Sequence, residues 1–128
     1  MMCTLISLFL DTSWLLRYTT FMQTTSTEIF LQTIGALNDE TRLTILRFID
    51  INGAVCVCDI ESAFGMIQSR ISRHLKILKE AGFLRVERKG RWAYYSIRSP
   101  LDKFRQDILK EVSYLEMVVP EFKGCCKN

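Results

Sequence analysis

The residues of this chain with the most distinctive chemistry are its cysteines. Five are present: Cys3, Cys56, Cys58, Cys125 and Cys126. The number is odd and the paired cysteines lie too close in sequence for loop-closing disulfides, which indicates reduced thiols rather than a secreted disulfide scaffold. Thiolates are soft ligands that select thiophilic ions. The four paired cysteines are therefore candidate ligands for a metal or metalloid.

The spacing of Cys56 and Cys58 restricts how they can act together. We predict a short helix from about position 56 or 57 to 64, closed by Gly65. Side chains two apart on a helix point to nearly opposite sides. Both sulfurs can therefore hold one ion only if the helix start is extended or unwound, and binding would favour a distorted helix. Two other interpretations stay open: burial of both thiols as small hydrophobic groups, and a redox switch.

Nothing in the chain predicts an enzyme. The single histidine is His74, and no Ser/His/Asp or Cys/His arrangement or phosphate-binding glycine loop accompanies it. We expect no catalytic residue and no constitutive cofactor.

Basic residues are concentrated in one quarter of the chain. Nine Lys or Arg lie between Met66 and Arg98, where only Glu80 and Glu87 oppose them. This segment carries +7, whereas the whole 128-residue chain carries +3. A basic face confined in this way is typical of a polyanion partner.

Hydrophobic periodicity predicts a helical protein with one hairpin. Helices are expected at about 26–37, 40–52, 56 or 57 to 64, 68–81 and 100–119, and a hairpin at 83–97. Ser99 is expected to cap the last helix, with Pro100 at its first position and Pro120 beyond its end. A short helix that turns into a basic helix is a helix-turn-helix, and the hairpin after it is a wing. We therefore predict a mainly α (α+β) winged helix-turn-helix with a two-stranded β wing and a C-terminal dimerisation helix.

The basic helix and the wing are the expected DNA-binding elements. Ile71, Leu75 and Leu78 form the apolar stripe of the helix, which leaves its other side chains for base edges and phosphates. The predicted DNA-binding residues are Gln68, Ser69, Arg70, Ser72, Arg73, His74 and Lys76 on the helix, and Arg88, Lys89 and Arg91 at the wing tip. A two-fold homodimer would bind a palindromic double-stranded operator. The alternative is a winged-helix module that binds protein or RNA and has structural cysteines.

Several segments together resemble the ArsR/SmtB family of metalloregulators. They are Asn38 to Leu46, the Cys-Val-Cys-Asp box in Val55 to Ile60, Gln68 to Leu78, Gly82 to Leu84, and Lys89 to Tyr95. The resemblance covers roughly residues 28–118. It implies a dimeric winged-helix repressor that leaves its operator when an inducer binds, with arsenite or antimonite as the typical inducer for this cysteine box. Cadmium or lead is the alternative, as sensed by other family members.

One position departs from the family pattern. The familiar arsenical box has a third cysteine where this chain has Glu61. Trivalent arsenic prefers three sulfurs, so the third is expected from Cys125 or Cys126, of the same or the partner subunit, with Cys3 a poorer candidate. Both tail cysteines together could instead complete a four-sulfur cadmium or lead site. Zinc is disfavoured because the last helix lacks the histidines of the family's interfacial zinc site.

The two ends of the chain are set apart from this domain. Residues 1–21 include a six-residue apolar run, Leu5 to Leu10, which no Lys or Arg precedes and which is too short to span a bilayer. We expect residues 1–21 to be an over-long start or leader before Met22. Residues 22–119 are expected to form the DNA-binding and dimerisation domain, and residues 120–128 a cysteine-containing tail. The sequence predicts a cytoplasmic protein with no membrane partner.

Overall fold

The computed structural model describes residues 25–124 and divides the chain into two compact units, Met1–Gln32 and Thr33–Asn128. Its helices are α2 (Ser26–Leu37), α3 (Glu40–Asn52), α4 (Val57–Phe64), α5 (Gln68–Glu80) and α6 (Lys103–Tyr114). Its strands are β1 (Val55–Cys56), β2 (Leu84–Lys89) and β3 (Trp92–Ile97). Within residues 25–124, no helix is long and apolar enough to cross a membrane.

Helix α2 begins as the sequence predicts, at the cluster of hydroxyl residues. The Thr25 hydroxyl accepts a hydrogen bond from the backbone N–H of Glu28, and the Glu28 carboxylate accepts one from the N–H of Thr25, each at 3.2 Å. This reciprocal capping box satisfies two amides that the first turn cannot pair. The apolar face of the helix is exposed, from 41% at Ile29 to 62% at Leu31.

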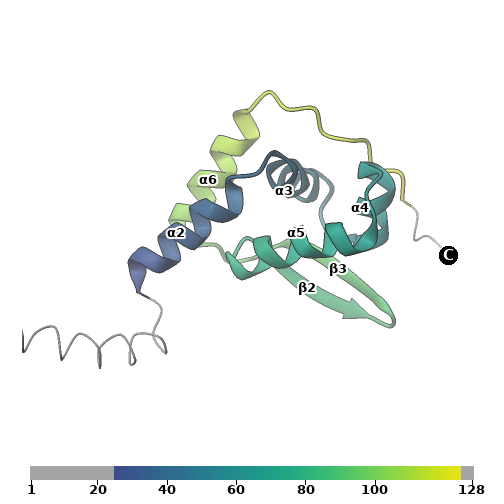
Figure 1. Cartoon of the computed structure of the whole chain (residues 1–128), viewed down its shortest axis with the longest axis horizontal. Coiled ribbons are helices and arrows are strands. Elements are labelled where there is room, and N and C mark those ends of the chain that lie inside the picture. Colours follow the sequence, from purple (N-terminus) through teal and green to yellow (C-terminus); the bar gives the residue numbers. More distant parts are fainter. Residues whose placement is uncertain (1–24, 125–128) are drawn as a thin grey trace, which may run out of the picture. The chain divides into compact units, whose positions relative to one another are not determined.

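The core of the second unit is built from the apolar stripes of α3, α4 and α5. Asp39 caps α3 by accepting a hydrogen bond from the N–H of Arg42 at 3.0 Å, and Gly53 ends it at a φ of 76°. The predicted stripe of α5 is fully buried. Figure 1 shows α5 between α3 and the β2–β3 hairpin, the position of a recognition helix above a wing. The fully buried side chains of the stripes are Ile45, Leu46, Phe48, Ile49, Ile60, Ile71, Leu75 and Leu78.

The wing is part of a three-stranded sheet, where the sequence predicts two strands. Strands β2 and β3 pair antiparallel from Leu84 opposite Ile97 to Lys89 opposite Trp92, which confirms the hairpin. Strand β1 adds to the other edge of β3, with Val55 opposite Tyr95. Two residues are too few to show an alternating pattern, and for that reason the strand was not predicted.

Helix α6 is shorter at both ends than its hydrophobic spacing predicts. Asp102, and not Ser99, is the N-cap, since its carboxylate accepts a hydrogen bond from the N–H of Arg105 at 3.3 Å. The helix ends at Tyr114, because Leu115 is extended, with a ψ of 133°. Apolar residues at helical spacing continue to Val119, so periodicity alone does not locate the last hydrogen-bonded turn.

Candidate functional site

The two cysteines of the Cys-x-Cys box converge at the junction of β1 and α4. Cys56 is the extended N-cap of the helix (φ −87°, ψ 163°), whereas Cys58 lies in its first turn. The two sulfurs and a carboxylate oxygen of Asp59 all lie within 4.8 Å of one another. The strand-to-helix junction therefore supplies the extended start that the spacing requires. The predicted distortion of the helix is not needed to bring the sulfurs together.

The environments of the two cysteines differ. Cys56 is 1% exposed, and its N–H donates to the Asp59 carboxylate at 3.1 Å. Burial, with a smaller contribution from the Asp59 charge, raises the pKa of the Cys56 thiol. Cys58 is half-buried and borders an open cleft. Cys125 and Cys126, the predicted donors of a third sulfur, lie outside the described residues, as does Cys3.

The outer faces of α5 and the wing tip present most of the predicted DNA-binding side chains. The exposed ones are Gln68, Ser69, Arg70, Arg73, Lys76, Arg88, Lys89 and Arg91, and Ser72 is half-buried. At the tip, the Arg91 guanidinium lies 5.3 Å from the centre of the Trp92 ring, and Lys89 Nζ lies 5.6 Å from that of Tyr94. These cation–π contacts orient two cations of the turn.

His74 differs from that expectation, since its side chain is 9% exposed and belongs to the buried side of α5. A three-residue spacing from Ile71 and a four-residue spacing from Leu78 place His74 beside the apolar stripe. Its burial was not predicted, because histidine is a polar residue type. Burial lowers the pKa of His74, and the positive charges of Arg42, Arg70 and Arg73 act in the same direction against the Asp39 carboxylate. The predicted outward orientation of His74 is therefore wrong, and its contact with DNA stays a prediction.

A cleft of about 280 Å³ is lined both by Cys58 of the cysteine box and by several of the predicted DNA-binding side chains. Three elements form its walls: α4, the start of α5, and the wing. The lining residues are Val57, Cys58, Glu61, Gln68, Ser72, Arg88, Arg91, Trp92, Ala93 and Tyr95. The aromatic wall was not predicted as part of a site, because in sequence these residues indicate only a β-strand.

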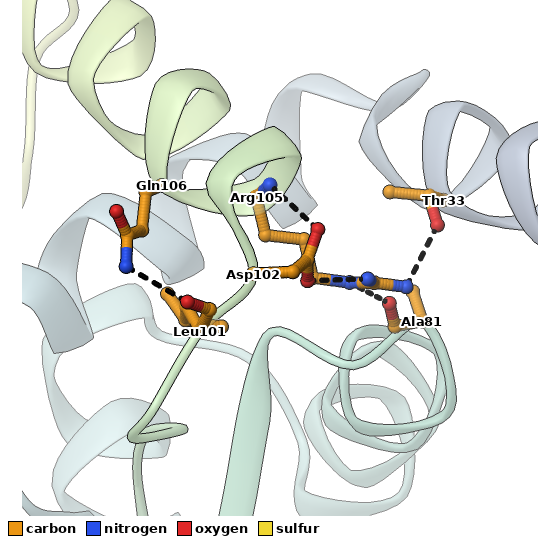
Figure 2. Close-up of polar contacts among 6 residues, drawn as sticks. All are labelled: Thr33, Ala81, Leu101, Asp102, Arg105 and Gln106. Carbon is orange, nitrogen blue, oxygen red and sulfur yellow. Dashed lines mark hydrogen bonds and ion pairs between the residues drawn. The ribbon is translucent and has the colours of Figure 1, made fainter.

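Sequence analysis also missed Arg105, which joins α6 to the end of α5. Figure 2 shows its guanidinium between three acceptors: it donates to the Ala81 carbonyl at 2.7 Å, the Asp102 carboxylate at 2.7 Å and the Thr33 hydroxyl at 3.0 Å. Ala81 is the C-cap of α5, so the charge lies at the negative end of that helix. The hydrogen bond from Arg105 holds the pKa of the Asp102 carboxyl below its usual value.

Comparisons with known proteins agree with this arrangement. The model of the family described as "Bacterial regulatory protein, arsR family" matches residues 39–86, which run from the cap of α3 into the wing. The chain is 36% identical to the arsenical resistance operon repressor of Escherichia coli K12 over an alignment of 81 residues. This alignment covers 63% of this chain and 69% of the repressor. The chain belongs to the ArsR family. This confirms the resemblance carried by the cysteine box and the recognition helix, and the family consists of regulatory proteins.

Two further relatives and one solved structure are also similar to this chain. The chain is 42% identical over 66 residues to the arsenical resistance operon repressor of Bacillus subtilis, of which it covers 63%, somewhat less than two thirds. It is 34% identical over 62 residues to a cadmium resistance regulatory protein homologue of Staphylococcus aureus, of which it covers 51%. A homodimeric winged helix-turn-helix DNA-binding domain from Mycobacterium bovis matches with a TM-score of 0.55 and 25% identity, over 68% of this chain and 77% of that one. The predicted winged-helix fold is confirmed.

Proposed function

We propose that this protein is a transcriptional repressor that binds operator DNA as a homodimer and leaves it when trivalent arsenic or antimony binds Cys56 and Cys58. The observation that carries the proposal is the convergence of the two cysteine sulfurs within 4.8 Å at the start of α4, which places two thiolates together in the reduced protein. Soft thiolates select soft ions. The named relatives include arsenical resistance repressors.

DNA binding is proposed to use α5 in the major groove and the wing tip on the adjacent backbone or minor groove. Exposed arginines on both elements support this role, because a guanidinium pairs with guanine edges and with phosphates. We expect a salt-sensitive preference for a palindromic duplex selected by the protein over random DNA. Equal affinity for both duplexes, or stronger binding to RNA, would favour the alternative of a general protein- or RNA-binding module.

The homodimer is proposed to bury the apolar surface of α6. Along this helix an apolar groove of about 270 Å³ runs between Phe104 and Leu115, which are 36% and 51% exposed. The exposed apolar side chains of α2 are a second surface that a partner subunit could cover. Contiguous apolar surface of this kind is typical of protein interfaces. Analytical ultracentrifugation should give twice the monomer mass, and Leu115→Asp should shift the protein toward monomer.

The third sulfur for arsenic is proposed to come from Cys125 or Cys126. The experiment is release of a labelled operator duplex, measured by fluorescence anisotropy, with the protein kept reduced by a phosphine that contains no thiol. Arsenite should release the wild type and the control Cys3→Ser. Cys58→Ser should bind the duplex with unchanged affinity and ignore arsenite. If folded Cys58→Ser loses DNA binding, or is released like the wild type, the sensing assignment is wrong.

Two second candidates use the same thiols. A cadmium or lead sensor is favoured by the relative named for cadmium resistance and by the number of cysteines, which suffices for four sulfurs. A redox regulator would use the same cysteines without a metal. Release by cadmium alone would support the first, and release by peroxide alone the second. Release by arsenite that is lost in the double variant Cys125→Ser/Cys126→Ser would support the arsenic site that includes the tail.

A further inference from the structure

The segment that follows α6 is anchored to its own subunit by an aromatic side chain. The ring centre of Phe122 lies 6.1 Å from that of Phe48, which is fully buried in α3. Phe48 in turn packs edge to face against Phe64, with ring centres 5.5 Å apart. Aromatic pairs prefer separations of this size. The three rings therefore connect the C-terminal segment, through α3, to the last residue of α4.

A second residue of this segment also packs against the body of the protein. Val119 is half-buried against the hydrophobic core, whereas Val118 beside it is 93% exposed. Figure 1 shows the segment leaving α6 and crossing to the side of the molecule where α4 lies. Cys125 and Cys126 themselves lie outside the described residues. The contacts of Val119 and Phe122 hold the chain up to three residues before Cys125.

The cysteine box lies within reach of a chain that starts from this anchor. Along α4, the axial distance from Phe64 back to Cys58 is about 9 Å at 1.5 Å per residue. Three extended residues, from Phe122 to Cys125, can span about 10 Å. The two lengths are comparable, so the tail is long enough to return along α4 to the start of that helix.

The same geometry favours a sulfur from the same subunit over one from the partner. The proposed dimer surface is the apolar groove of α6, and Figure 1 shows α6 and α4 on opposite sides of α3. A dimer formed through α6 therefore keeps the cysteine box of each subunit away from the interface. A tail anchored at Phe122 has the box of its own chain within reach, whereas the partner's box lies across the dimer.

We propose that Phe122 is a positioning residue, which holds the C-terminal segment on its own subunit so that a tail sulfur joins Cys56 and Cys58 of the same chain as the third ligand of arsenic. This inference rests on the proposed function, and it identifies the subunit that supplies the third sulfur.

The proposed site forms in the reduced protein. Cys58 is disulfide-bonded in this structure, so that bond has to be opened before arsenic binds. A phosphine reduces the disulfide to two thiols and is itself oxidised to the phosphine oxide, with an oxygen from water. Arsenite, As(OH)₃, then exchanges its three hydroxyls for three thiols: three As–O bonds break, three As–S bonds form and three waters leave. Arsenic stays trivalent.

The magnitude of the effect follows from the effective concentration of the tethered sulfur, which falls roughly as the −3/2 power of the free linker length. With Phe122 anchored, the linker to Cys125 has three residues; without it, Val119 is the last packed residue and the linker has six. Phe122→Ala should therefore weaken arsenite binding about threefold. Val119→Ala/Phe122→Ala, which frees the chain from the end of α6, should weaken it about sevenfold.

Arsenite affinity is measured without DNA, by the arsenic–thiolate absorbance, in a phosphine reductant. Val118→Ala is the matched control, because it shortens an exposed side chain of the same segment, and it should bind like the wild type. The measurement is repeated for Phe122→Ala in the background Cys125→Ser/Cys126→Ser, where no tail sulfur remains. There Phe122→Ala should leave the weaker arsenite affinity unchanged. A general disturbance of the core would weaken binding in both backgrounds.

A mixed dimer identifies the subunit that donates the sulfur. One subunit carries Cys58→Ser and the other carries Cys125→Ser/Cys126→Ser, and two affinity tags isolate the pair. If all three sulfurs come from one chain, neither site of the mixed dimer is complete, and no binding at wild-type affinity should appear. If the tail reaches across the dimer, the mixed dimer regains one complete site.

The outcomes distinguish the inference from the proposed function. A weakening by Phe122→Ala that requires the tail cysteines, together with no wild-type-affinity site in the mixed dimer, supports the inference. Unchanged affinity in Phe122→Ala, an equal loss in both backgrounds, or a complete site in the mixed dimer overturns it, while arsenic on Cys56 and Cys58 stands. Failure of the reduced wild type to bind arsenite overturns the proposed function itself.

Discussion

Replacing Arg105 with alanine should lower the free energy of unfolding by about 3 kcal/mol. Its part-buried bonds to the Ala81 carbonyl and the Thr33 hydroxyl are charge-assisted, each worth about 1.5–3 kcal/mol. The Asp102 carboxylate is 50% exposed, so that ion pair adds only about 0.2–1 kcal/mol. Because bonds that share one group are not additive, the total lies below their sum.

Urea denaturation checks this value, with a midpoint shift of roughly 1–2 M and an unchanged slope. Arg105→Lys should recover about half of the loss, since an ammonium cannot reproduce the planar fork. The matched control is Arg47→Ala, which breaks a surface ion pair with Asp50 within α3 and should cost about 0.5 kcal/mol or less. If Arg105→Ala is no more destabilising than Arg47→Ala, the three-acceptor anchor does not stabilise the fold.

Three further predictions concern local features. Gly82→Ala should be more destabilising than Gly53→Ala, as measured by paired urea titrations. Both glycines have a positive φ, which strains any residue with a Cβ. Only at Gly82 would the new Cβ also clash with a side chain, at 2.8 Å from Arg105 Nε. Because the pKa of His74 lies below its usual 6.5, its neutral form contributes stability that is present above pH 6.5 and is lost as the pH falls below that value. In thermal melts between pH 8 and 5, the melting temperature of His74→Leu should therefore fall less with decreasing pH than that of the wild type. Asp39→Ala should cost about 1 kcal/mol by removing the cap of α3, whereas Asp39→Asn should cost less, as judged by urea midpoints.

The helices and the wing could be predicted because local signals coincide there. Asp39, Gly53 and Gly65 end or begin helices by chemistry that is visible in the sequence. The hairpin was predictable for the same reason, since a short glycine-containing turn separates two β-rich runs. The end of α6 was not, because apolar spacing continues beyond the last turn to Val119.

The outward side of α5 was predicted except at one position. Seven residues of α5 were expected to face outward, and His74 is the one that lies on the buried side. Beside the three apolar positions of the stripe, the burial of a flanking residue depends on the element that packs against it. For His74 that element is the start of α3, with its N-cap Asp39 and with Arg42. Periodicity gives the centre of a face more reliably than its edges.

The cleft and the hydrogen bonds of Arg105 could not be predicted from the sequence, for a different reason. Each joins elements that are separated in the chain, as Arg105 and Thr33 are by 72 residues. The cleft depends on β1, because pairing of Cys56 with Tyr94 places the cysteine box beside the wing. A two-residue strand that no pattern predicts therefore brings the proposed sensing thiols next to the proposed DNA-binding arginines.

If the pairing of β1 with β3 couples arsenic binding to DNA release, a change in β1 that leaves both thiols intact, such as Val55→Pro, should separate the two. Arsenic absorbance that persists without operator release would support that role, and loss of both together would assign β1 to the thiol site alone.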